Sequence, residues 1–182
     1  MNNGIFVVSE LTGRVRDQVR AVQLECDPRL ARTTPPHITL VGSSGVGPMP
    51  IDTPASRIRE LLSGIVADTP PISVHLGRPM RFMQTDIVVL PLDPHGPLRT
   101  LHERIARSGL VFERSRFPFA PHCTLSFYPT LTPELRRKLF AVRVEEPVLI
   151  ERLQFYATVN PQPGRRVLEL VLGEGIEPIL AW

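Results

Sequence analysis

The sequence of 182 residues contains very little lysine. Lys138 is the only one, so 20 of the 21 basic residues are arginines. Guanidinium binds phosphate in a bidentate manner, which favours a phosphate-bearing ligand, although a GC-rich coding sequence produces the same bias. The net charge of +3 is small and excludes the broad basic surface that binds nucleic acid duplexes.

Cysteine and long apolar runs are also scarce. The two cysteines, Cys26 and Cys123, exclude a disulfide scaffold. No run approaches the roughly 18 apolar residues of a membrane-spanning helix, so no membrane partner is expected. A hydrophobic fraction of 42% in a chain of this length is enough for a core. We therefore expect one globular domain, residues 1–182, that is monomeric and cytoplasmic.

The order of expected elements occurs twice along the chain. Strand-like runs and helical spacing of apolar residues predict strand, helix, strand, helix and strand, and the same order then returns with one strand added. The expected strands are 4–9, 37–41, 72–76, 86–92, 122–127, 148–159 and 166–172, and the expected helices are 12–27, 54–67, 96–108 and 132–140. Residues 29–36 are expected to form a loop and 161–164 a turn. The repeat predicts two similar lobes about a pseudo-two-fold axis.

Each half carries the pattern Pro-His-x-Thr-Leu, at residues 36–40 and again at 121–125. Alternate side chains of a strand share a face, about 7 Å apart, so the histidine, the threonine and the residue after the leucine should point one way. These polar faces comprise His37, Thr39 and Val41 in the first half, and His122, Thr124 and Ser126 in the second. The intervening apolar residues should face the core.

An imidazole beside a hydroxyl suits a phosphate group. The ring moves a proton, and the hydroxyl donates a hydrogen bond to a non-bridging oxygen. Two such pairs supply one general base and one general acid, which in-line attack on a phosphodiester requires. A zinc site is the competing interpretation, but the two histidines lack a third ligand at useful spacing, so no metal and no cofactor are expected.

The paired motifs resemble those of the two-histidine (2H) phosphoesterase superfamily. Within it, the chain resembles the bacterial RNA 2′,3′-cyclic phosphodiesterase and 2′-5′ RNA ligase family. The resemblance implies an α+β fold of two lobes, each an antiparallel sheet with flanking helices, around a central cleft. It also implies metal-independent hydrolysis of 2′,3′-cyclic phosphate ends or 2′-5′ linkages, with ligase activity in the reverse direction. By this resemblance His37 and His122 are catalytic, and Thr39 and Thr124 bind the phosphate.

The chain departs from the family after the second motif. Many ligase-like members carry a basic residue there, whereas this chain has Ser126, Phe127 and Tyr128. The departure leaves open a small-molecule substrate of the ADP-ribose cyclic phosphate type besides RNA ends or a small nucleotide. A non-catalytic RNA-binding module is a further alternative. The sequence does not decide which histidine is the acid and which is the base.

Other residues are weaker candidates. Substrate contacts are expected from side chains in the loops before the motif strands and from aromatic residues near the cleft: Arg32, Arg116, Phe82, Tyr128 and Tyr156. The remaining histidines, His75, His95 and His102, are interpreted as solvent-exposed.

Overall fold

The computed structural model describes residues 3–82, 84–159, 164–174 and 179–180. Within these residues, one antiparallel sheet of seven strands has the order β4-β5-β6-β2-β1-β8-β9. Its strands are β1 (Gly4–Glu10), β2 (His37–Val41), β4 (Met80–Arg81), β5 (Val88–Pro91), β6 (His122–Ser126), β8 (Arg152–Thr158) and β9 (Arg165–Val171). A small second sheet has the order β10-β3-β7, made of β10 (Ile179–Leu180), β3 (Ile72–Val74) and β7 (Val148–Ile150).

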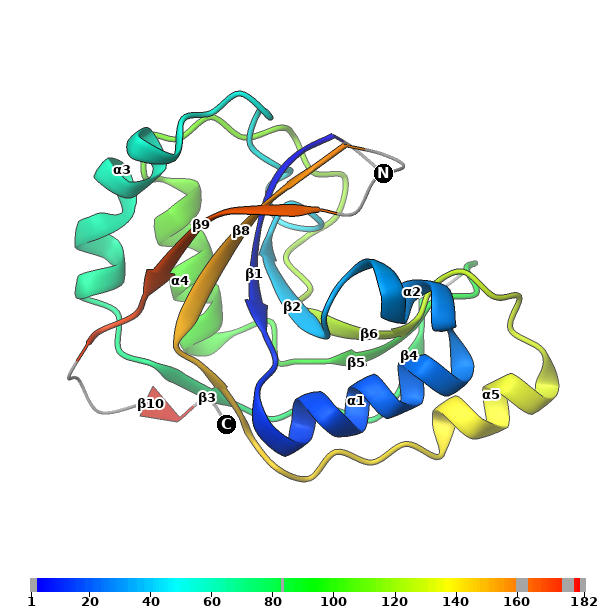
Figure 1. Ribbon diagram of the computed structural model, residues 1–182. Coiled ribbons are helices and arrows are strands. Elements are labelled where there is room, and N and C mark those ends of the chain that lie inside the picture. Colours follow the sequence, from blue (N-terminus) through cyan, green and yellow to red (C-terminus); the bar gives the residue numbers. More distant parts are fainter. Residues whose placement is uncertain (1–2, 83, 160–163, 175–178, 181–182) are drawn as a thin grey trace.

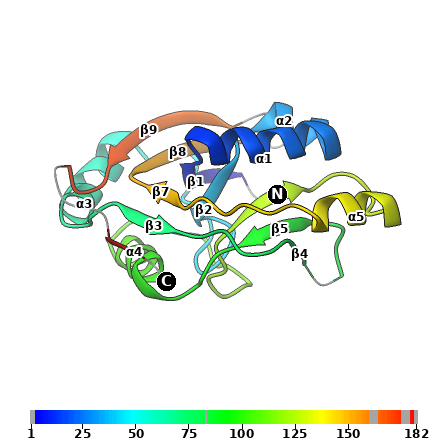
Figure 2. The same cartoon turned by 90° about the horizontal axis from the view of Figure 1, so that it is seen from below.

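Helices lie at both ends of the large sheet. They are α1 (Gly13–Cys26), α2 (Pro28–Thr33), α3 (Ala55–Ala67), α4 (Gly96–Ala106) and α5 (Pro133–Phe140). α3 and α4 pack together at one end of the molecule, and α1, α2 and α5 gather at the other (Figure 1, Figure 2). None of the helices in the described residues combines the length and hydropathy needed to cross a membrane.

The predicted α+β class with antiparallel sheets is confirmed. The structure adds the two short strands β4 and β10, which the sequence did not predict, and differs from the expected elements in two further places. Residues 28–33 of the expected loop form α2, because the Asp27 side chain accepts a hydrogen bond from Leu30 N and Pro28 occupies the first turn. The expected strand 148–159 is divided at Glu151 between the two sheets. Residues 161–163 of the expected turn lie outside the described residues.

The two motif strands, β2 and β6, are hydrogen-bonded neighbours at the centre of one sheet. The sequence predicted instead that each lobe has its own sheet and that the motifs face each other across a cleft. Ile38 pairs with Cys123, and these are the equivalent residues between the histidine and the threonine of each motif. The strand order β5-β6-β2-β1 is therefore symmetric about this pair, with one strand–helix–strand unit on either side.

A β-bulge follows each threonine of the motifs. On the β2 side, Val8 pairs with Thr39 but Val7 pairs with Val41, so one residue of β2 is skipped. The equivalent shift occurs between β5 and β6, beside Ser126. Both Val41 and Ser126 are fully buried, contrary to the prediction that they continue the polar faces. A bulge re-aims the side chains beyond it, and strict alternation does not anticipate that change.

The two halves interlock through their helices. Gln23 of α1 donates a hydrogen bond to the carbonyl oxygen of Thr124, at 2.8 Å. His102 of α4 has its Nδ1 2.7 Å from the carbonyl oxygen of Leu40. Each helix thus supports the motif strand of the other half. His102 is only 4% exposed and stacks on Phe119, so the prediction that it is solvent-exposed is wrong.

Candidate active site

The two motif histidines have equivalent backbone anchors. His37 Nδ1 lies 2.8 Å from the carbonyl oxygen of Pro35, and His122 Nδ1 lies 2.8 Å from that of Ala120. A carbonyl oxygen only accepts, so each Nδ1 carries the hydrogen. Nε2 of each ring is then the nitrogen that exchanges a proton with a ligand.

The register of the sheet sets the positions of the four motif side chains. Because Ile38 lies opposite Cys123 on antiparallel strands, His37 lies beside Thr124 and Thr39 lies beside His122. Side chains of such cross-strand pairs are about 5 Å apart at Cβ. All four are partly exposed, whereas Ile38 and Cys123 between them are fully buried. Each histidine can therefore share one phosphate with the threonine of the other motif.

The threonine hydroxyls are available to a ligand. Neither Thr39 nor Thr124 makes a side-chain hydrogen bond to any other described residue, and the same holds for Nε2 of His37 and His122. The strands thus present two proton-transferring nitrogens and two hydroxyl donors on one face, without internal partners that a substrate must displace.

The surroundings of the two histidines differ. Burial lowers the pKa of His37, but its hydrogen bond to Pro35 and the nearby Glu10 carboxylate act in the opposite direction. Glu10 lies directly opposite His37 on β1. Burial also lowers the pKa of His122, and there the charge of His37 adds to the lowering. His37 is therefore the better placed of the two to hold a proton.

The residues beside His122 are apolar, whereas His37 has the carboxylate of Glu10 beside it. His122 lies opposite Pro91 on β5. The ring of Phe82 packs edge-on against the His122 imidazole, with 4.9 Å between ring centroids and an interplanar angle of 87°. No carboxylate of the described residues acts on the pKa of His122. This environment favours the neutral ring, which accepts a proton through Nε2.

A hydrogen-bonded network holds Glu10 in place. The Tyr156 hydroxyl donates to Glu10 Oε1 at 2.5 Å, and the Glu10 amide donates to Gln154 Oε1 at 3.0 Å. Burial, with the adjoining Glu10 carboxylate, raises the pKa of Tyr156 to about 12, so this hydroxyl stays protonated as a donor. Gln154 also donates to Glu169, which lowers the pKa of that carboxyl together with the nearby arginines.

The structure brings two of the predicted aromatic contacts to the histidines. Phe82 touches His122 directly, and Tyr156 reaches His37 through Glu10. Tyr128 follows the end of β6 and lies under the guanidinium of Arg29, with 4.0 Å from Cζ to the ring centroid.

The two predicted arginine contacts have different settings. Arg32 lines a groove that ends at Pro36, the residue before His37. Arg116 is exposed in the loop before β6 and makes no hydrogen bond or ion pair with any residue in the described part of the chain. Of the other predicted exposed histidines, His75 and His95 are exposed as expected.

Sequence reasoning missed Glu10 and Asp27. Alternation along β1 places Glu10 on the same face as Phe6 and Val8, but only the sheet order shows that His37 is its neighbour. Asp27 precedes a proline, which is a recognisable helix start, yet its further hydrogen bonds to Phe127 N and Tyr128 N link residues 100 and 101 positions apart.

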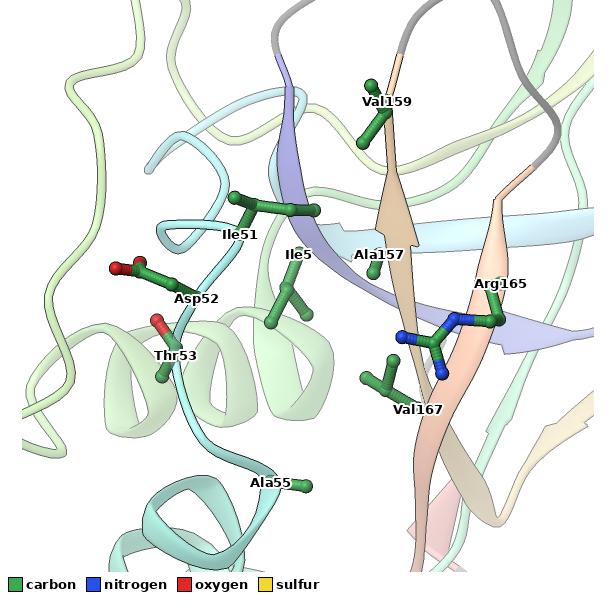
Figure 3. Close-up of a pocket in the computed structure, with 9 residues that line it drawn as sticks. All are labelled: Ile5, Ile51, Asp52, Thr53, Ala55, Ala157, Val159, Arg165 and Val167. Carbon is green, nitrogen blue, oxygen red and sulfur yellow. The ribbon is translucent and has the colours of Figure 1, made fainter.

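A cavity lies away from the histidines. It has a volume of about 500 Å³ and lies between β1, β8, β9 and the segment before α3 (Figure 3). Ile5 forms part of its floor and lies on the face of β1 opposite to Glu10. The two histidines on the neighbouring strands β2 and β6, rather than this cavity, provide the groups needed for proton transfer. Among the described residues, no three His, Cys, Asp or Glu side chains are grouped to hold a metal ion.

Comparison with known proteins identifies a family and a fold that match this chain. A family model described as the 2′-5′ RNA ligase superfamily matches residues 11–161. The fold is similar to that of E. coli LigT without ligand, at 19% identity, a TM-score of 0.55, and coverage of 93% of this chain and 97% of that chain. LigT complexed with 3′-AMP gives 16% identity, a TM-score of 0.56, and coverage of 94% and 99%.

A structure named only as a phosphoesterase gives 18% identity, a TM-score of 0.55, and coverage of 94% and 99%. At these identities the solved structures establish the fold alone. No curated protein sequence matches the chain.

Proposed function

The chain belongs to the 2′-5′ RNA ligase superfamily, a group of phosphoesterase and ligase-like enzymes, and from this premise we propose that it is a phosphodiesterase. It opens 2′,3′-cyclic phosphate ends of RNA or nucleotides, or 2′-5′ linkages, through His37 and His122. We further propose that residues 1–182 act as one bilobed domain. The proposal rests on one observation: two histidines lie on neighbouring strands, each anchored through Nδ1 to a backbone carbonyl and each opposite the threonine of the other motif.

The reaction divides the proton transfers between the two rings. One neutral imidazole takes a proton from water through Nε2 as the water oxygen bonds to phosphorus. The bond from phosphorus to one ribose oxygen breaks, and the protonated imidazole gives its Nε2 proton to that leaving oxygen. Thr39 and Thr124 donate hydrogen bonds to the non-bridging oxygens, where negative charge accumulates.

The neighbours of each ring support an assignment of roles. His37 faces the Glu10 carboxylate, which stabilises imidazolium, so His37 serves as the general acid in hydrolysis. His122 faces Pro91 and Phe82, which do not stabilise a charge, so His122 serves as the general base. In the ligation direction, the two roles exchange.

Ligands of a structural relative support a nucleotide substrate. E. coli LigT has been crystallised with 3′-AMP, with phosphate and with ATP. A nucleoside 3′-phosphate resembles the product of opening a 2′,3′-cyclic phosphate. A substrate of this size also suits the partly exposed setting of the four motif side chains.

Turnover measurements test the proposal. A nucleoside 2′,3′-cyclic phosphate, a 2′-5′ dinucleotide and ADP-ribose cyclic phosphate are assayed with the wild type, His37→Ala and His122→Ala. Each alanine variant is expected to lose activity by a factor of about 10² to 10⁴, because it lacks one proton-transfer group. EDTA is expected to leave activity unchanged. His95→Ala is the control, since His95 is exposed at the start of α4.

Three results would contradict the proposal. Full activity in either motif-histidine variant would remove those rings from the mechanism. Binding of nucleotides without turnover would identify a non-catalytic RNA-binding module. Turnover confined to ADP-ribose cyclic phosphate would assign the chain to the small-molecule class.

A further inference from the structure

A groove of about 410 Å³ lies between α1 and the segment that leads from α2 into β2. Its lining contains three arginines and no acidic residue; the residues are Arg16, Arg20, Ala31, Arg32, Thr33, Thr34, Pro35 and Pro36. We call this surface the arginine groove. It is large for a single phosphate ion, and its cations come from two separate elements, α1 and α2.

The guanidinium groups of the groove are only weakly neutralised. Arg32 forms no ion pair or hydrogen bond with any other described residue. Arg16 is paired with its exposed neighbour Asp17, at 2.8 Å, and exposed pairs of this kind contribute little. Arg20 donates one N–H to the carbonyl oxygen of Thr34 at 3.3 Å, and no carboxylate among the described residues pairs with its charge.

Arginines elsewhere are commonly paired with acids. Arg57 lies 2.9 Å from Glu60, and Arg99 lies 2.9 Å from Glu103. The absence of such acids from the lining of the arginine groove therefore concentrates positive charge there. Clustered guanidinium groups favour a ligand with more than one phosphate.

The arginine groove adjoins the catalytic strand. Its wall residue Pro35 provides the carbonyl oxygen that holds His37 Nδ1, and Pro36 directly precedes His37. Two residues of extended chain span at most about 7 Å, which is the rise of roughly two stacked nucleotides. An RNA chain whose reacting end lies at the histidines can therefore place its next phosphates in the arginine groove.

We propose that the arginine groove binds backbone phosphates of the RNA strand that carries the reacting cyclic phosphate. This inference rests on the proposed function and specifies its substrate class: an oligoribonucleotide end is preferred to a mononucleotide. The arginine groove supplies basic residues that can bind the RNA chain, whereas no basic residue directly follows the second motif. The small net charge of the protein is compatible with RNA binding, because the binding needs only the three arginines that the groove brings together.

The test compares two substrates. kcat/KM is measured for a nucleoside 2′,3′-cyclic phosphate and for a six-nucleotide RNA that ends in a 2′,3′-cyclic phosphate. The ratio of kcat/KM for the RNA to kcat/KM for the mononucleotide should exceed about tenfold in the wild type. It should fall several-fold in Arg32→Ala and further in Arg16→Ala/Arg32→Ala.

The salt dependence is a second measurement. For the RNA, the slope of log kcat/KM against log salt should flatten by about 0.7 per arginine that loses a phosphate contact. Arg57→Ala, which removes an exposed arginine of α3, is the control and should change neither quantity.

The outcomes separate this inference from the proposed function. Equal kcat/KM for both substrates, or a ratio that does not change in the arginine variants, would refute RNA binding by the arginine groove. The proposed phosphodiesterase activity would not be affected by that result. The arginine variants are also assayed with ADP-ribose cyclic phosphate, and a fall in kcat/KM confined to that substrate overturns the inference in favour of a pyrophosphate ligand.

Absence of turnover on both substrates overturns the proposed function instead. Whether the arginine groove binds RNA is then measured by fluorescence anisotropy with a labelled six-nucleotide RNA bearing a 3′-phosphate. Binding that weakens in Arg32→Ala supports the groove, and binding that does not change refutes it.

Discussion

Replacing Asp27 with alanine should destabilise the protein strongly. The Asp27 side chain joins the start of α2 to the end of β6: one carboxylate oxygen accepts from Leu30 N at 3.0 Å, and the other accepts from Phe127 N at 2.7 Å and Tyr128 N at 2.9 Å. The residue is only 1% exposed, so water does not readily replace these bonds. Loss of the helix cap costs about 1 kcal/mol. Two backbone amides left without an acceptor cost about 1–3 kcal/mol each, which together with the cap gives a total of roughly 3–7 kcal/mol.

The change in the free energy of unfolding can be measured by denaturant unfolding, and the change in Tm by thermal unfolding, both followed by circular dichroism. At about 2–4 °C per kcal/mol for a chain of this size, Tm should fall by roughly 10 °C. Asp27→Asn retains one carbonyl acceptor and should fall between the alanine variant and the wild type. Asp17→Ala is the matched control, because Asp17 is exposed and, among the described residues, pairs only with Arg16, so a change within about 0.5 kcal/mol is expected. A loss below about 1 kcal/mol in Asp27→Ala would refute the reasoning that three amides depend on this carboxylate.

Three further predictions concern pH. Glu10→Gln removes the carboxylate opposite His37 and should lower the pKa of that ring, which moves the alkaline limb of kcat/KM to lower pH; an NMR titration that shows no change would contradict the assignment. Phe82→Ala admits water beside His122, so the pKa of His122 should rise and the acidic limb should move to higher pH. Because burial lowers the pKa of His37, His102 and His122 in the folded state, the unfolded chain binds more protons, and the free energy of unfolding should decrease as pH falls below about 6.5. This acid sensitivity should shrink in His102→Gln, and unfolding curves that are independent of pH between 7 and 5 would refute it.

The sequence predicted most of the strands, the fold class and the burial of the residues between His and Thr, because these depend on local alternation, but it did not predict the short strands β4 and β10. Ile38 and Cys123 are fully buried as expected. Alternation failed at Val41 and Ser126, because the β-bulge that turns them inward depends on the neighbouring strands β1 and β5. A single strand carries no signal of the register that its neighbour imposes.

The position of Glu10 was beyond sequence reasoning for a related reason. The chain order does not reveal that β2 lies between β6 and β1, so neither the proximity of the two motifs in one sheet nor the carboxylate beside His37 could be derived. The burial of His102 in α4 could not be predicted for the same reason. Its burial depends on Leu40 and Phe119, which belong to other elements.

The dependence of kcat/KM on pH, measured for a nucleoside 2′,3′-cyclic phosphate in the wild type and in both motif-histidine variants, tests the central claim most directly. The account predicts a bell-shaped profile in the wild type, because one ring must be neutral and the other protonated. The residual activity of His37→Ala should lack the alkaline limb, and that of His122→Ala should lack the acidic limb. A profile without both limbs in the wild type, or limbs that survive in the two variants, would contradict acid–base catalysis by this pair.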